Sequence, residues 1–105
     1  MPVVMLHGFT GNLATWRPLA KTLGERYTMV LVDLIGHGGS DAPEDPARYS
    51  MERCVEDLLT LADRLELREA VWMGYSMGGR VCLCLGVTAP ERSRALVLEL
   101  SLIHI

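Results

Sequence analysis

A glycine-rich segment between two apolar runs constrains this chain more than any other feature. Residues 74–80 read Gly-Tyr-Ser-Met-Gly-Gly-Arg, with the apolar run 70–73 before them and the apolar run 81–85 after them. A short apolar run is typical of a buried strand, and glycines directly after it mark a tight turn. The pattern therefore predicts a strand, a sharp turn and a helix, with Ser76 at the apex of the turn.

The spacing of this segment is G-x-S-x-G, which is typical of a nucleophile elbow. In such an elbow the serine Oγ is exposed on a strained turn, and small residues at Gly74 and Gly78 let the strand and helix backbones pass close together. The N-terminus of the helix directs unpaired N–H groups and a positive dipole end at the atom under attack. We therefore expect Ser76 to be the catalytic nucleophile; a glycine-rich turn with an incidental serine is the alternative.

Apolar runs alternate regularly with amphipathic segments along the rest of the chain. Strands are expected at residues 3–6, 27–32, 70–73 and 95–99, and helices at 13–23, from the cap Ser50 to Leu65, and at 77–88. Short continuous apolar strands separated by such helices predict an α/β fold. Its parallel sheet would be covered by helices on both faces.

Composition excludes several classes of protein. The chain has 105 residues, which is enough for one small domain. Its net charge is −3, and it has no basic patch that would bind nucleic acid. It has no apolar stretch of membrane-span length and no signal peptide, so we expect a cytoplasmic protein. The odd set of Cys54, Cys82 and Cys84 predicts buried reduced thiols, and neither a metal site nor a cofactor is expected. The oligomeric state stays open.

The loops that follow the strands are the expected place for chemistry, because open parallel sheets bind ligands beyond the carboxyl ends of their strands. The first loop reads His7-Gly8-Phe9-Thr10-Gly11. A serine nucleophile needs backbone donors for the developing oxyanion, and we expect these to be the N–H groups of Met77 and Phe9. A simple glycine turn between strand and helix is the alternative for the first loop.

Other polar side chains are candidates for supporting roles. We expect Asp33 and His37 to shape the second loop, and His7 to be a buried polar tie in the first. His37 and His104 remain alternatives for the general base, which must reach Ser76 Oγ at hydrogen-bond distance. Glu99 could orient a histidine, but a solvated or salt-bridged carboxylate at a strand end is the favoured interpretation.

Arg80 lies four residues after Ser76, which places it near the first turn of the predicted helix. A guanidinium at this position could bind a substrate carboxylate through two parallel hydrogen bonds. An exposed helix arginine without a ligand is the alternative, and position alone leaves both open.

Residues 7–11, 33–40 and 74–80 together resemble the α/β-hydrolase superfamily, and the resemblance extends to about Glu99. Within it, the segment 74–80 and the strand that ends at Glu99 are similar to the family of 2-succinyl-6-hydroxy-2,4-cyclohexadiene-1-carboxylate synthases of menaquinone biosynthesis. Those enzymes eliminate pyruvate from a carboxylate-rich enolpyruvyl cyclohexene. The resemblance implies the following site residues: Ser76 in the triad, Phe9 and Met77 in the oxyanion hole, and Arg80 and Tyr75 at a carboxylate of a small polycarboxylate substrate.

The resemblance also implies how much of an enzyme is present. It predicts that residues 1–99 are the N-terminal portion of one α/β-hydrolase core domain, with the catalytic Asp and His beyond them and the isolated chain inactive or nearly so. Ile35 stands where the family usually has proline, and residues 100–105 depart from its pattern, so a non-native tail is one interpretation of them. The alternatives to the lyase are a serine carboxylic-ester hydrolase on the same fold and a non-catalytic binding protein of that fold.

Overall fold

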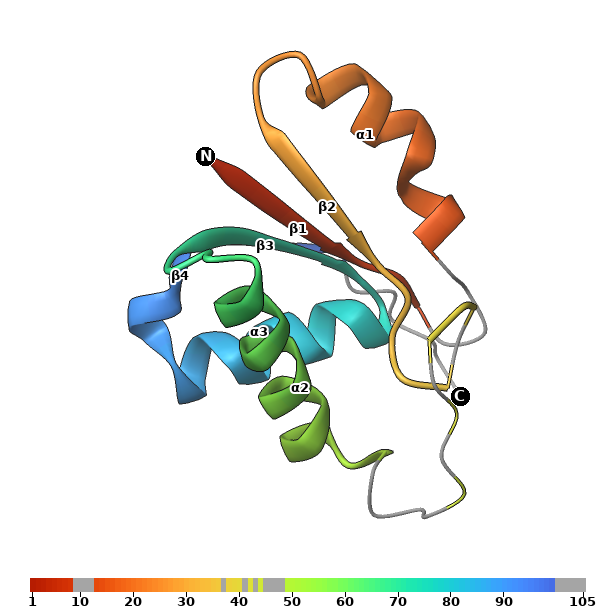
Figure 1. The fold of residues 1–105 in the computed structure, drawn as a ribbon, viewed down its shortest axis with the longest axis vertical. Coiled ribbons are helices and arrows are strands. Elements are labelled where there is room, and N and C mark those ends of the chain that lie inside the picture. The colour runs from red at the N-terminus through yellow and green to blue at the C-terminus, as the bar shows by residue number, and fades with distance from the viewer. Residues whose placement is uncertain (9–12, 37, 41, 43, 45–48, 100–105) are drawn as a thin grey trace.

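The computed structural model describes residues 1–8, 13–36, 38–40, 42, 44 and 49–99. Its strands are β1 (Pro2–Leu6), β2 (Thr28–Val32), β3 (Ala70–Tyr75) and β4 (Ser93–Glu99). They form one sheet in the order β2-β1-β3-β4, and every neighbouring pair is parallel (Figure 1). The expected parallel α/β architecture is therefore confirmed.

Helices cover both faces of this sheet, as predicted. The 3₁₀ turn η1 (Leu13–Trp16) and helix α1 (Arg17–Leu23) lie on one face, while α2 (Met51–Arg64) and α3 (Met77–Thr88) lie on the other (Figure 1). The strand β1 lies between β2 and β3 and alternates between two cores. Val4 and Leu6 pack with α2 and α3, and Val3 and Met5 pack with Trp16. Burial on both faces explains why this strand is a continuous apolar run.

Local chemistry explains where α2 begins and ends. The backbone N–H of Arg53 donates to Ser50 Oγ at 3.1 Å, which satisfies one of the orphan donors of the first turn. One face of α2 is buried, with Cys54, Val55, Leu58 and Ala62 in the core. The helix ends at Arg64, so Leu65, which was expected to end the helix, is the C-cap and 47% exposed.

Several predicted boundaries differ from the structure, and the strands expected at 3–6 and 27–32 each differ by one residue at their start. The helix expected at 13–23 divides into η1 and α1, because Pro18 lacks the N–H of a helix interior and fits only the first turn of α1. The strand expected at 70–73 continues to Tyr75, and the strand expected at 95–99 begins at Ser93. Both extensions arise because β3 and β4 pair along their length, which propensity within one segment does not reveal.

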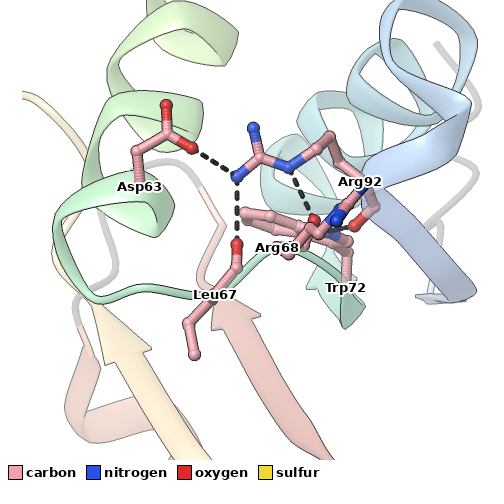
Figure 2. A network of polar contacts seen from close by, with 5 residues as sticks. All are labelled: Asp63, Leu67, Arg68, Trp72 and Arg92. Carbon is pink, nitrogen blue, oxygen red and sulfur yellow. Dashed lines mark hydrogen bonds and ion pairs between the residues drawn. The ribbon is translucent and has the colours of Figure 1, made fainter.

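The guanidinium of Arg92 forms a network of hydrogen bonds near the amino-terminal ends of β3 and β4 (Figure 2). Arg92 Nε donates to the carbonyl of Arg68 at 2.7 Å, and one terminal nitrogen donates to the carbonyl of Leu67 at 3.0 Å and to Asp63 Oδ1 at 2.7 Å. The indole N–H of Trp72 donates to the carbonyl of Arg92 at 3.2 Å. This cluster, the Arg92 clamp, joins the end of α2 and the loop before β3 to the short connector η3 (Pro90–Arg92) that leads into β4.

None of the helices in the described part of the chain combines the length and the apolar composition that a membrane span requires.

Candidate active site

The predicted elbow is present at the carboxyl end of β3. Strand β3 ends at Tyr75, α3 begins at Met77, and Ser76 between them has φ 53° and ψ −112°. A non-glycine residue at positive φ is uncommon and costs roughly 1–3 kcal/mol, so the surrounding structure must hold it. The strained serine turn expected from the spacing is therefore the geometry that is found.

The two glycines beside the serine are required by close backbone contacts. A β-carbon at Gly74 would lie 2.3 Å from the carbonyl oxygen of Gly78, and one at Gly78 would lie 2.3 Å from the carbonyl oxygen of Leu6. Neither position can hold a side chain without moving backbone. The start of α3 thus lies directly against both β3 and β1, as the motif predicts.

The backbone of Ser76 is fixed on both sides. Its N–H donates to the carbonyl of Glu99 at 2.7 Å, and its own carbonyl accepts the N–H of Arg80 at 3.0 Å. Its Oγ makes no capping bond to α3 and no other hydrogen bond with the described residues. The hydroxyl is therefore available to a base and a substrate while the main chain around it is held.

One of the two expected oxyanion donors can be located. Met77 is the first residue of α3, where backbone N–H groups have no partner within the helix. Phe9, the other expected donor, lies outside the described residues, as do Thr10 and Gly11. The residue just before Phe9 is placed, however. A β-carbon on Gly8 would lie 3.0 Å from Tyr75 Cδ2 and 3.5 Å from Ser76 Cβ, so the first loop begins against the elbow.

His7 is a buried polar tie, as expected from its place after β1. Its side chain has no exposed surface, its Nδ1 lies 2.7 Å from the carbonyl oxygen of Gly8, and the N–H of Leu34 donates to its Nε2 at 3.0 Å. Both ring nitrogens are engaged in the backbone. Among the described residues there is no other histidine, because His37 and His104 lie outside them.

The second loop is organised around Asp33, in agreement with the expected structural role. The N–H of Gly39 donates to Asp33 Oδ2 at 3.0 Å, and Ser40 Oγ donates to the Asp33 carbonyl. Gly38 has φ 53°, and a β-carbon there would overlap the carboxylate, at 2.4 Å. The loop therefore wraps closely around this side chain beside the carboxyl end of β2.

Arg80 and Tyr75, the predicted substrate contacts, flank the serine. Arg80 is exposed on the first turn of α3, and its guanidinium makes no hydrogen bond or ion pair with any residue that the structure describes. Tyr75 is 37% exposed and ends β3. The structure brings Tyr75, Ser76, Met77 and Arg80 together with Gly8 at one edge of the sheet.

A small apolar cavity adjoins Met77. It has a volume of about 150 Å³ and is lined by Leu34, Ile35, Tyr49, Met51, Cys54, Met77 and Val81. A larger hollow of about 260 Å³ lies beside α2, and its lining includes Asp33, Ser40 and Asp57 but no residue of the elbow. The smaller cavity is the one whose lining includes a residue of the elbow, Met77.

The buried thiols are not additional nucleophiles. Burial, with Asp57 and then Cys84 as lesser causes, raises the pKa of Cys54 to about 11. Burial, reinforced by Cys54, raises the pKa of Cys82 to about 12. A thiol reacts as its thiolate, so both are inert near neutral pH. Within the described ranges, no three His, Cys, Asp or Glu side chains are grouped to hold a metal ion.

A parallel sheet covered on both faces and a strained serine between strand and helix define an open α/β protein with an elbow at its carboxyl edge. The chain belongs to the alpha/beta hydrolase fold family, whose model matches residues 1–104.

Known proteins similar to this chain differ in their chemistry. A Bacillus subtilis (strain 168) protein with the provisional name 2-succinyl-6-hydroxy-2,4-cyclohexadiene-1-carboxylate synthase is 45% identical over 97 residues, which cover 92% of this chain and 35% of that protein. A pimeloyl-[acyl-carrier protein] methyl ester esterase of Nitrosomonas europaea is 39% identical over 99 residues, covering 94% of this chain and 36% of the esterase. The chain thus spans about a third of the length of these relatives.

Solved structures support the same fold. The crystal structure of a hydrolase from Pseudomonas aeruginosa PA01 superimposes with a TM-score of 0.85 at 36% identity, over 92% of this chain and 36% of that one. An enol-lactonase from Burkholderia xenovorans LB400 gives a TM-score of 0.85 at 29% identity, over 90% and 36% of the two chains.

Two contacts at the site were missed by the sequence reasoning. The carbonyl of Glu99 accepts the Ser76 N–H, and the N–H of Leu34 donates to His7. Both depend on backbone atoms from segments distant in sequence, so side-chain identity gives no signal for them. The only sequence signal was topological, because all these residues follow or end parallel strands.

Proposed function

We propose that this chain supplies the nucleophile and oxyanion side of the active site of a carbon–oxygen lyase. The reaction is elimination of pyruvate from an enolpyruvyl cyclohexene carboxylate, giving 2-succinyl-6-hydroxy-2,4-cyclohexadiene-1-carboxylate in menaquinone biosynthesis. The proposal includes a cytoplasmic location, where the thiols of Cys54, Cys82 and Cys84 stay reduced. The Bacillus subtilis relative supports this choice among the chemistries of the family.

The observation that carries the proposal is the exposed cation beside the serine. Arg80 is one helical turn from Ser76, to which its N–H is bonded, and no described residue neutralises its guanidinium. A planar guanidinium binds a carboxylate through paired charge-assisted hydrogen bonds. The site therefore favours an anionic substrate, with Tyr75 as a second contact from the end of β3.

In the proposed reaction each group has one task. A general base outside the described residues takes the proton of Ser76 Oγ, and the activated oxygen removes a proton from the ring carbon. The electron pair left on that carbon shifts through the ring alkene and the bond from the ring to the enolpyruvyl oxygen breaks. The released enolpyruvate takes up a proton from the protonated base and leaves as pyruvate. The N–H groups of Met77 and Phe9 stabilise the negative charge that develops on the substrate.

The discriminating experiment compares two substrates in the complete gene product. Arg80→Ala should lower kcat/KM for the carboxylate-rich substrate about 10- to 100-fold, the effect of losing hydrogen bonds to a charged group. Turnover of a neutral ester should change less than about threefold, and Ser76→Ala should abolish both. Arg80→Lys keeps the positive charge but lacks the paired N–H donors of the planar guanidinium. It is the matched control and should show an intermediate loss. Equal losses on both substrates would contradict the lyase assignment.

A serine ester hydrolase is the second candidate, and one observation favours it. The cavity of about 150 Å³ beside Met77 is lined mostly by apolar side chains, which suits an acyl group better than a carboxylate. The methyl ester esterase of Nitrosomonas europaea shows that the family includes such chemistry. Rapid Ser76-dependent turnover of esters without any pyruvate release would select this candidate. No Ser76-dependent turnover of either substrate would instead favour a non-catalytic binding protein.

A further inference from the structure

Three of the seven described residues that line the cavity beside the elbow carry sulfur. They are Met51, Cys54 and Met77, and the cavity that they share has a volume of about 150 Å³. Methionine commonly fills irregular gaps in a core, so a single thioether there would need no explanation. Two thioethers and a thiol on one small cavity are instead a set of soft donors, the type of ligand that selects Cu(I).

The beginnings of two helices bring the three residues together. Met51 is the first residue of α2, and Cys54 follows three positions later, so both lie on the same side of that helix. Met77 is the first residue of α3, and its side chain packs against the buried cluster that contains Cys54. The donor set therefore arises from the packing of α2 on α3 and not from a motif within one segment.

The rest of the lining decides which cation fits. Leu34, Ile35 and Val81 are aliphatic, and the phenol of Tyr49 is the only side-chain oxygen among the described residues that line the cavity. Ca²⁺ and Mg²⁺ require several oxygen ligands, so this lining does not suit them. One thiolate and two neutral thioethers balance a single positive charge, whereas a divalent ion would leave an uncompensated charge in apolar surroundings.

The cavity can be reached from solvent. Two of its lining residues, Tyr49 and Met51, are exposed, whereas Cys54 is buried. A thioether therefore lies at the mouth of the cavity and the thiol lies deeper inside. An entering ion would meet the sulfur of Met51 first and lose its water shell to sulfur ligands as it moves inward.

We propose that Met51, Cys54 and Met77 form a binding site for a soft monovalent cation, Cu(I), in the cavity beside the elbow. On binding, the thiol of Cys54 gives its proton to solvent and its sulfur bonds to the metal, while each thioether sulfur donates a lone pair. No electron is transferred. The bound ion lies against the residue that follows Ser76, so its presence blocks turnover at the elbow. Binding itself does not depend on the proposed reaction.

The binding experiment uses Ag(I), which has the charge and softness of Cu(I) without its redox chemistry, in chloride-free buffer. The complete gene product carries ¹³C in its methionine methyl groups, and single Met→Leu variants assign the resonances. At one equivalent of Ag(I), the resonances of Met51 and Met77 should shift. Those of Met5 and Met73, which pack in the core on the other face of the sheet, should not. Unshifted resonances of Met51 and Met77 would overturn the proposal.

The affinity for Cu(I) is measured by competition with a chromophoric chelator in the absence of oxygen. Cys54→Ser replaces a soft ligand by a hard one, and Met51→Leu removes a thioether at similar volume. Each should weaken binding by about tenfold or more. Cys84→Ala is the matched control, because Cys84 is a less buried thiol that does not line the cavity, and it should bind like the parent. An equal or larger loss in Cys84→Ala would overturn the proposal.

The block at the elbow is measured as the ratio of turnover with and without Ag(I) in each variant. One equivalent should abolish Ser76-dependent turnover in the parent and in Cys84→Ala, and Cys54→Ser should retain most of its own. Full turnover of the parent with Met51 and Met77 resonances shifted would overturn the block. Absence of Ser76-dependent turnover without the ion would overturn the proposed function instead, and the methyl spectra would still decide the metal site.

Discussion

The backbone N–H of Ser76 donates to the carbonyl oxygen of Glu99 at 2.7 Å, which joins the apex of the elbow to the end of β4. The bond continues the β3–β4 ladder one residue beyond Tyr75, which pairs with Glu99. The sheet thereby supports the turn at a residue whose φ is positive. The contact uses only the main chain of Glu99, whose side chain is exposed.

Replacement of the Glu99 carboxylate should therefore have little effect. In Glu99→Gln the carbonyl that accepts the Ser76 N–H is retained, so we expect Ser76-dependent turnover within about twofold and a free energy of unfolding within about 0.5 kcal/mol of the parent. Steady-state kinetics and urea denaturation of the complete gene product measure both quantities. A 100-fold loss of turnover would show instead that this carboxylate orients the catalytic base.

Substitution of Gly78 by alanine should destabilise the fold strongly. The new methyl group would lie 2.3 Å from the carbonyl oxygen of Leu6 and 2.6 Å from that of His7, and both belong to a buried backbone. Overpacking of this kind costs about 1–3 kcal/mol or more, which urea denaturation would detect as a lower midpoint.

Gly86→Ala is the matched control on the same helix. There the nearest atom to a β-carbon is Leu96 Cδ1 at 2.7 Å, the end of a side chain that can move. The gain in helix propensity, about 1 kcal/mol, should offset the contact and leave stability nearly unchanged. Equal destabilisation by the two substitutions would contradict the assignment of Gly78 to a backbone crossing.

The Arg92 clamp predicts that its arginine matters more than its carboxylate. The side chain of Asp63 is 67% exposed and that of Arg92 only 17%, so the ion pair should contribute less than about 1 kcal/mol. Arg92 also donates to the backbone carbonyls of Leu67 and Arg68, and its removal ends both of these charge-assisted bonds. We expect Arg92→Ala to lower the free energy of unfolding by about 2–3 kcal/mol and Asp63→Ala by less than 1 kcal/mol.

Arg92→Lys is the control for charge, because lysine keeps the cation but cannot bridge both carbonyls. It should lose most of the stability that Arg92→Ala loses. If Asp63→Ala and Arg92→Ala proved equally destabilising, the ion pair would be the dominant contact and the clamp would be misassigned.

The raised pKa values of the two buried thiols predict that the free energy of unfolding falls at alkaline pH. From an ordinary value of 9.0, burial raises the pKa of Cys54 to about 11 and that of Cys82 to about 12. Below pH 9 both thiols are protonated in the folded and the unfolded chain, so this stability is fully present. Between pH 9 and 11 the unfolded chain loses these protons and the folded chain keeps them, so the free energy of unfolding falls.

Denaturant titrations at several pH values measure this dependence. For each thiol the unfolding equilibrium constant should rise by up to about tenfold per pH unit above 9. The double variant Cys54→Ala and Cys82→Ala should show a shallower fall over the same range. An unchanged slope would contradict the burial of the two thiols.

The elbow could be predicted in detail because its signal is local. Ser76 lies between a strand and a helix that adjoin in sequence, and the glycines that the turn requires are part of the same heptapeptide. The Ser50 cap of α2 was equally local, since it depends on a bond from Arg53 three residues away. In both cases a few neighbouring residues determine the geometry.

Contacts between distant segments could not be predicted in the same way. The Arg92 clamp unites η3 with the end of α2, and only the pairing of β3 with β4 brings them together. The sequence predicts that His7 is a buried polar tie, but it carries no signal for Leu34 as the partner, because that partner is a main-chain N–H. The expected donor Phe9 lies outside the described residues and stays a prediction.

The sheet order has a consequence for how the chain folds during synthesis. Of these four strands β1 leaves the ribosome first, and it pairs with β2 on one side and with β3, at Ala70–Tyr75, on the other. Until those later residues emerge, one edge of a fully apolar strand has no partner, and such edges promote association with other chains. Parallel pairing between segments so far apart is also slow, because a long loop must close first. Early synthesis is thus the stage at which a chain of this topology most needs protection by a chaperone.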